Sequence, residues 1–159
     1  MTEMSVPGVA FDVVRSMGAA EHFLAVVTTL RPDGTPHASL VNAGVMPHPV
    51  TGAMVAAFVN HGRRKLEHLR ARPVLTLTWR SGWAWISLDG RAELAGPDDA
   101  FDAWTPDEQA QRLPGLLRAI FSAAGGTHDD WDTYDRVMAE ERRVAVLMTP
   151  TRGYGDYGR

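Results

Sequence analysis

Basic side chains gather in one short stretch of the chain, residues 60–73 (NHGRRKLEHLRARP). Arg63, Arg64 and Lys65 are consecutive and stand where a short helix should begin, and Arg70 follows further along. The free N–H groups and the dipole of a helix N-terminus favour anions. Arg adds a planar fork and Lys a point charge, both suited to phosphate. The stretch therefore predicts an anion site, with a solvated basic surface helix as the alternative.

Apolar runs on both sides of the basic stretch predict that this helix joins two buried strands. Within it, Leu66 and Leu69 are three residues apart and can face a core together. We expect Asn60 to cap the helix and Pro73 to end it.

Six runs read as β-strands from their β-branched and aromatic content: 23–30, 36–45, 54–59, 74–80, 83–94 and 143–149. Pro32-Asp33-Gly34 predicts a tight turn, because Pro presets φ and Gly accepts a positive φ. Asp89-Gly90 predicts a bulge or bend. Tight turns between strands imply antiparallel pairing, and the helical crossing favours a barrel over an open sheet. The fold class is therefore mainly β with flanking helices.

The length of 159 residues predicts one domain, 1–159. Its expected parts are an N-terminal helix within 1–20, a barrel with the basic helix in 21–95, a helical insertion in 96–142, and a last strand and tail in 143–159. In the insertion we expect a helix over 108–124, interrupted near Pro114, and a second over 127–141. Residues 154–159 are expected to be a tail.

Charge and cysteine content exclude several classes of function. The net charge of -3 argues against broad nucleic-acid binding and suits a small anionic ligand better than a polyanion. The chain has no Cys, which excludes disulfides and Cys-ligated metals and fits the cytosol. We see no signal peptide and no apolar run approaching the roughly 20 residues of a membrane helix. We therefore expect a cytoplasmic protein with no nucleic-acid or membrane partner.

Other reactive side chains form no catalytic pattern, so the catalytic residues are unknown. No serine lies in a G-x-S-x-G elbow, and the chain lacks H-E-x-x-H, G-x-G-x-x-G and Walker A motifs. His61 and His68 are seven apart, so they would lie on one side of the basic helix. Ordinary helix surface is the favoured interpretation of this pair, and we predict no metal site.

Three tryptophans, Trp79, Trp83 and Trp85, flank the tight turn at Ser81-Gly82. They fit a core or subunit-interface cluster. They also fit a flat wall for a planar ring system, which beside a phosphate clamp would suit a phosphorylated ring cofactor.

The order of these motifs resembles the split β-barrel flavin and deazaflavin oxidoreductases related to pyridoxamine 5′-phosphate oxidase. The matching pieces are AVVTTLRPDGTPHASLV, RRKLEHLRARPVLTLTW, WAWISLDGRAEL, HDDWDTYDRVM and RRVAVLMTPTRGYG, which together run from about Phe23 to Tyr154. The sequence is most similar to the actinobacterial branch that uses the deazaflavin coenzyme F420.

The resemblance implies a six-stranded antiparallel split barrel that forms a homodimer, with the cofactor and a small-molecule substrate at the dimer interface. It implies that Arg63 and Lys65, with Arg64 beside them, clamp the cofactor phosphate. It implies ring contacts at Ser39, Val41 and Asn42, and an approach of Trp83 from the partner subunit.

Two positions depart from the family pattern. Relatives often carry Asn in the basic helix where this chain has His68, and a large aromatic where it has Ala43-Gly44. The small pair could leave room beside the ring for a bulkier substrate, or could weaken cofactor binding.

Three functions fit these observations. The first is an F420-dependent oxidoreductase that transfers a hydride between the deazaflavin and a planar organic substrate. The second is an FMN-dependent oxidase or flavin reductase. The third is a non-catalytic binder of a cofactor, haem or tetrapyrrole, with His61 or His68 as axial ligand.

Overall fold

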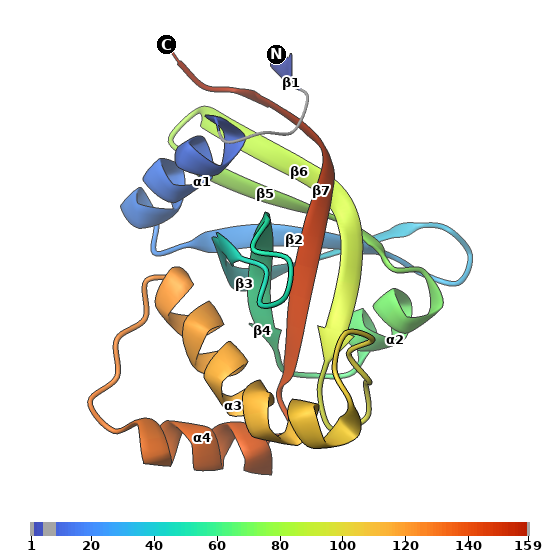
Figure 1. Ribbon diagram of the computed structural model, residues 1–159. Helices are drawn as coiled ribbons and strands as arrows, with labels where there is room; N and C mark the ends of the chain where they lie inside the picture. The colour runs from blue at the N-terminus through green and yellow to red at the C-terminus, as the bar shows by residue number, and fades with distance from the viewer. Residues whose placement is uncertain (1, 5–8, 159) are drawn as a thin grey trace.

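The structure, a computed structural model, describes residues 2–4 and 9–158 and consists of a β-barrel with helices around its outside (Figure 1). Its elements are β1 (Thr2–Met4), α1 (Val9–Ala20), β2 (Leu24–Leu30), β3 (Pro36–Pro47), β4 (Met54–Asn60), α2 (Arg64–Ala71), β5 (Val74–Ser81), β6 (Ala84–Ala95), α3 (Pro106–Ala123), α4 (Trp131–Glu140) and β7 (Val144–Asp156).

Six strands close the barrel through antiparallel pairs in the order β7-β4-β3-β2-β5-β6, and β6 pairs back onto β7. The short β1 adds to the free side of β7. This topology confirms the predicted six-stranded antiparallel barrel. The register of β6 against β7 shifts between Asp89 and Gly90, so the predicted bulge is also confirmed.

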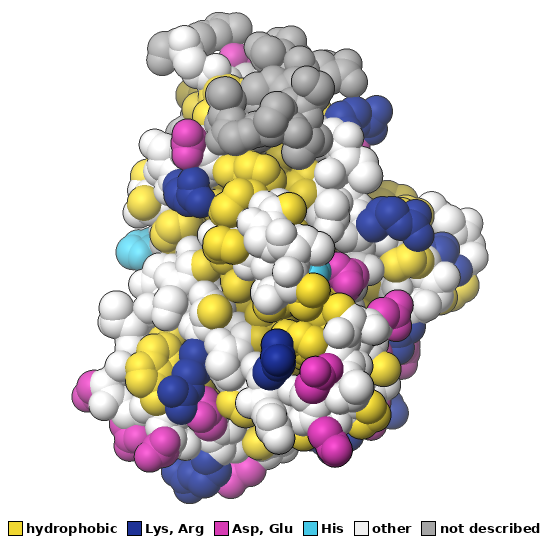
Figure 2. All heavy atoms as spheres, in the orientation of Figure 1, with side chains coloured by type: hydrophobic (Ala, Val, Ile, Leu, Met, Phe, Trp, Pro, Cys, Tyr) yellow, Lys and Arg dark blue, Asp and Glu magenta, His cyan; other side chains and the backbone are white. Residues whose placement is uncertain are grey.

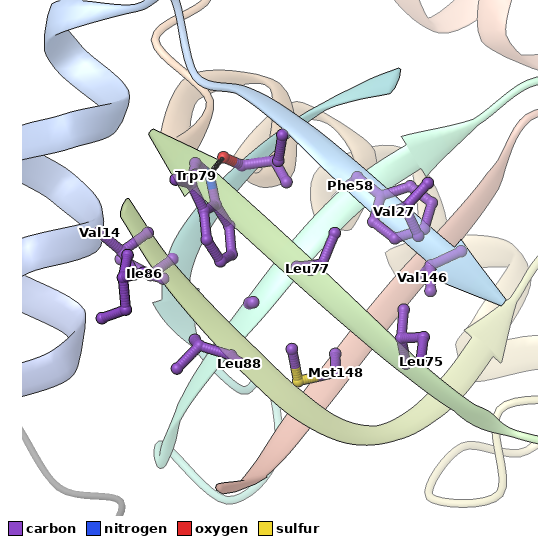
Figure 3. Packing of buried hydrophobic residues seen from close by; sticks show 14 of the residues in the cluster. Val14, Val27, Phe58, Leu75, Leu77, Trp79, Ile86, Leu88, Val146 and Met148 are labelled. Carbon is purple, nitrogen blue, oxygen red and sulfur yellow. Dashed lines mark hydrogen bonds between the residues drawn. The ribbon is translucent and has the colours of Figure 1, made fainter. Parts of the chain in front are cut away.

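The barrel interior holds the main hydrophobic core (Figure 3). Val14 of α1 covers one end, next to Ile86 and Trp79. Trp79 is fully buried, and its indole Nε1–H donates to the carbonyl of Ala43 at 2.9 Å. That bond satisfies the one polar atom the ring brings into the core.

A second core lies outside the barrel, where α3 packs on β3, β4 and β7 and α4 packs against α3. Along β4, Ala56 and Phe58 face the barrel interior while Val55 and Ala57 face the helices. The strand is therefore buried on both sides, which explains why its sequence is apolar without alternation. The mixed charges in the lower part of Figure 2 lie where α3 and α4 face away from the barrel.

The predicted cap of the basic helix is wrong. Asn60 is the last residue of β4, and its side-chain amide donates to the Gly62 carbonyl at 3.1 Å. The helix α2 begins at Arg64 and has no side-chain cap. Its first N–H groups are therefore not satisfied by a capping side chain, which leaves them available to an anion.

The predicted interruption at Pro114 is also wrong, since α3 is continuous from Pro106 to Ala123. Thr105 and Glu108 form a capping box that starts it two residues earlier than expected. Pro114 removes the N–H that would bond to the carbonyl of Ala110, and Ala110 lies exposed, where water can replace that donor.

The predicted tail and the predicted start of the last helix need correction as well. Residues 154–156 belong to β7 and pair with 85–87 of β6. At Gly155 an added Cβ would meet the carbonyl oxygen of Trp85, so the glycine permits this close pairing. The last helix, α4, begins at Trp131 rather than near Thr127, because Asp130 caps it by accepting from the Thr133 N–H.

Candidate functional site

Lys65 and Ser39 meet where α2 crosses the barrel beside β3. The Lys65 ammonium donates to the Ser39 hydroxyl at 3.2 Å, and the side chain is half-buried. Burial lowers the pKa of Lys65, because a desolvated ammonium is disfavoured. No salt bridge in residues 2–4 and 9–158 involves Lys65. A partly desolvated cation without a counter-ion is poised to take an anionic ligand.

The other basic residues of the stretch separate into two groups. Arg63 and Arg64 are exposed at the start of α2 and, within the described ranges, also enter no salt bridge. Arg70 instead makes a two-pronged salt bridge to Asp99, with both N–O distances 2.7 Å. Arg72, which follows the helix, lies apart from both groups: it is partly buried, and its Nε has no hydrogen-bond partner among the described residues. Within α2, the basic side chains without a salt bridge are therefore those of the first turn, while Arg70 ties the helix to the loop that precedes α3.

The three predicted ring contacts on β3 do not share one face. Ser39 and Val41 are partly buried on the side that faces α2 and the core, whereas Asn42 is exposed on the other side. The Asn42 side-chain amide donates to the carbonyl of His22 at 2.9 Å. Ser39 is thus placed beside Lys65 and Val41 near it, while Asn42 lies at the corner between α1 and β2.

Two histidines, His37 and His68, lie next to this site. The sequence analysis considered His68 but did not single out His37. His68 of α2 is buried, and its Nδ1 lies 2.8 Å from the hydroxyl of Thr29. His37 of β3 meets the His68 ring edge-on, with ring centres 5.3 Å apart. Sequence alternation places His37 on the Ser39 side of β3, but only the β2–β3 register brings it opposite Thr29.

Of the two alternatives for Ala43-Gly44, the structure does not leave the room that the first one requires. Ala43 is fully buried in the barrel core. At Gly44 an added Cβ would meet the backbone carbonyl of Ala123 at the end of α3. The small residues therefore let α3 approach β3, and they open no space for a substrate.

A shallow apolar groove of about 890 Å³ crosses the outer face of β2, β3 and β5 and ends at the β5–β6 turn. Leu24, Val26, Leu40, Trp83 and Trp85 contribute its apolar surface. Trp83 is 98% exposed and Leu40 66% exposed. A contiguous patch of exposed large apolar side chains is typical of an interaction surface. Trp79, by contrast, packs in the core and does not reach this groove.

The expectation that His61 and His68 lie together on the helix surface is wrong, because His61 is exposed before α2 begins whereas His68 is buried inside the helix. Among residues 2–4 and 9–158 no cluster of three or more His, Asp or Glu side chains could hold a metal ion. In the same part of the chain, every helix is too short or too polar to cross a membrane.

A closed six-stranded antiparallel barrel, crossed by a basic helix between β4 and β5, defines the split β-barrel class. Residues 18–128 match the sequence profile of a family described as pyridoxamine 5′-phosphate oxidase. The match spans well over half of the chain, which therefore belongs to the pyridoxamine 5′-phosphate oxidase family.

Solved structures share the fold at low sequence identity. An FMN-binding protein related to pyridoxamine 5′-phosphate oxidase, from Nostoc punctiforme, superposes with a TM-score of 0.61 at 13% identity, covering 96% of this chain and 86% of that one. A heme-binding protein from Mycobacterium smegmatis gives 0.59 at 18%, covering 98% and 57%. An F420 reductase gives 0.56 at 15%, covering 94% and 98%.

Proposed function

We propose that the protein is an F420-dependent oxidoreductase acting on a planar organic substrate. The observation that carries the proposal is the half-buried Lys65 at the start of an uncapped helix. Lys65 has a hydroxyl partner but, among the residues that the structure describes, no counter-ion. That arrangement fits the phosphate of a ring cofactor. The F420 reductase with the same barrel supports the choice of a deazaflavin, at the level of fold.

In this proposal the start of α2 binds the phosphate. Lys65 supplies a partly desolvated charge, Arg63 and Arg64 supply guanidinium forks from the exposed side, and the uncapped N–H groups of α2 face the same anion. The Ser39 hydroxyl, which accepts a hydrogen bond from Lys65 in the structure, would donate a hydrogen bond to the bound phosphate. A bound deazaflavin supplies hydride transfer, and the chain's part is to hold it against the substrate.

The proposal includes a homodimer formed through the groove on β2, β3 and β5. Leu24, Val26, Leu40 and Trp83 expose apolar surface that a second copy would cover. The exposed Trp83, at the tip of the β5–β6 turn, would then reach the cofactor site of the partner subunit and stack on a planar ring. The ring contacts at Ser39, Val41 and Asn42 belong to the same proposal.

The second candidate is FMN in the same site. The FMN-binding neighbour and the family description favour it, and its phosphomonoester would use the same clamp. A haem-binding role has a neighbour of its own. It is less well supported by the side chains, because His68 is buried within α2.

Parallel fluorescence titrations of the purified protein with F420 and FMN test this proposal. Tight, saturable binding of F420 with weak FMN binding supports the deazaflavin function. The reverse preference moves the protein to an FMN-dependent oxidase or flavin reductase. Binding of neither leaves α2 as a solvated basic surface and refutes both. A Soret band on haem titration, lost on His61→Ala, would instead support the haem role.

A further inference from the structure

His37 lies within the cation cluster of the proposed phosphate site. Its neighbour across the β2–β3 ladder is Thr29, and its ring meets His68 of α2 edge-on. The His37 Nδ1 atom is buried and has no hydrogen-bond partner among the described residues. Buried polar atoms without a partner are few in folded proteins, and each calls for an explanation such as a bound ion or water.

The groups that face His37 come from three elements and are neutral or cationic. They are Arg31 from the β2–β3 turn, Arg64, Lys65 and His68 from α2, and the uncharged Thr29 from β2. Arg31 is held near the strand by a hydrogen bond to the carbonyl of Pro36.

Burial is the largest cause that lowers the pKa of His37, followed by repulsion from Arg31, His68, Lys65 and Arg64. His37 is therefore a neutral imidazole at neutral pH. The charged groups of the described residues that act most strongly on the ring are all basic, so an arriving anion would shift the pKa of His37 in the opposite direction.

We infer that His37 is the proton-accepting member of the anion site, so that a phosphate group bound at Lys65 is bound together with a proton on His37. The inference rests on the proposed function, because it requires an anion at the start of α2. It makes His37 a positioning residue that adjusts the charge of the site to that of its ligand. Protonation makes both ring nitrogens of His37 N–H donors, including the Nδ1 that has no partner among the described residues.

The sign of the pH dependence follows from the two protonation states. In the free protein the pKa of His37 is lowered, and a neighbouring anion raises it. Affinity therefore strengthens as pH falls through the bound-state pKa and levels off below the free-state pKa, where the ring is already charged. A phosphodiester such as that of F420 keeps its charge across this window. A phosphomonoester such as FMN itself takes up a proton at pH ~6, so the effect of His37 on FMN affinity is measured above that pH.

The experiment measures binding of F420 and FMN by fluorescence from pH about 5.5 to 8.5, around the ordinary histidine pKa. Calorimetry in two buffers of different ionisation enthalpy then gives the protons taken up per ligand bound. For the wild type we expect net proton uptake near neutral pH and an affinity at least about threefold tighter at the acidic end for the diester. His37→Gln should bind with no uptake and a flat profile. His22→Asn, at an exposed histidine by the other end of β2, is the matched control and should keep the wild-type profile.

The outcomes separate this inference from the proposed function. Wild-type binding without proton uptake, or uptake that persists in His37→Gln, overturns the role of His37 and leaves the phosphate clamp intact. Weaker binding in Lys65→Met together with a flat His37→Gln profile supports both. A wild type that binds neither ligand at any pH overturns both. Thermal melts of each variant show whether His37→Gln is folded. If it is not folded, the pKa of His37 is measured in the wild type by NMR, with and without inorganic phosphate. A rise of this pKa on adding phosphate supports the inference, and an unchanged pKa overturns it.

Discussion

Replacing Lys65 with Met removes the ammonium while keeping the length and apolar stem of the side chain. This ammonium is partly desolvated and has one hydroxyl partner, and no counter-ion approaches it within residues 2–4 and 9–158. A residue with these features contributes little to folding, because its charge is buried without compensation. We therefore expect opposite effects of Lys65→Met on ligand binding and on stability.

The magnitude follows from the kind of contact. A hydrogen bond between a charged donor and phosphate contributes about 1.5–3 kcal/mol, which corresponds to a rise in Kd of roughly tenfold to a hundredfold or more. Arg63 and Arg64 remain to hold part of the affinity. The free energy of unfolding should stay the same or rise by up to about 1 kcal/mol, because the desolvation cost of the ammonium disappears.

Arg70→Met on the same helix is the matched control. Arg70 pairs with the largely buried Asp99, so its removal leaves a carboxylate without its partner. The loss should lower the free energy of unfolding by about 1–3 kcal/mol and leave the Kd unchanged. Fluorescence titration with F420 or FMN and urea unfolding of both variants measure the two quantities. If Lys65→Met destabilises the fold like Arg70→Met, or leaves the Kd unchanged, Lys65 is structural and the clamp is refuted.

Three further predictions rest on other parts of the molecule. Trp83→Ser combined with Leu40→Ser should convert a dimer into a monomer in light scattering without lowering the melting temperature of the isolated chain; a monomeric wild type would contradict the groove as a dimer surface. Gly44→Ala should cost about 1–3 kcal/mol in urea unfolding, because its methyl group meets the Ala123 carbonyl, and an unchanged midpoint would show that α3 yields easily. Burial acts to raise the pKa of Asp89, but hydrogen bonds from three neighbouring side chains outweigh it and hold this pKa below its usual value. The contribution of Asp89 to the free energy of unfolding is therefore fully present above pH about 4 and is lost as the pH falls further. Asp89→Asn should make the free energy of unfolding depend less on pH below that value; an unchanged dependence would refute the stabilising role of Asp89.

Much of the barrel could be predicted because its strands carry local signals. The apolar run in β4 and the turn at Pro32-Asp33-Gly34 are each specified by neighbouring residues. The bulge at Asp89-Gly90 is another signal of this kind. Missed boundaries had a signal too: Thr105 and Glu108 have the spacing of a capping box, and it marks the true start of α3.

Tertiary contacts account for what the sequence could not predict. From the sequence, Ala43-Gly44 suggests free space, but in the structure the end of α3 lies against Gly44. Arg70 is indistinguishable in sequence from the other basic residues of α2 until Asp99 is placed beside it. The His37 site depends on the register of β2 against β3, which no local pattern specifies.

A crystal structure of the protein with F420 or FMN bound would show directly where the cofactor phosphate lies. We expect the phosphate at the start of α2, within hydrogen-bond distance of the Lys65 ammonium, and Trp83 of a second copy beside the ring. A phosphate bound elsewhere, with Lys65 still donating to Ser39, would contradict this expectation.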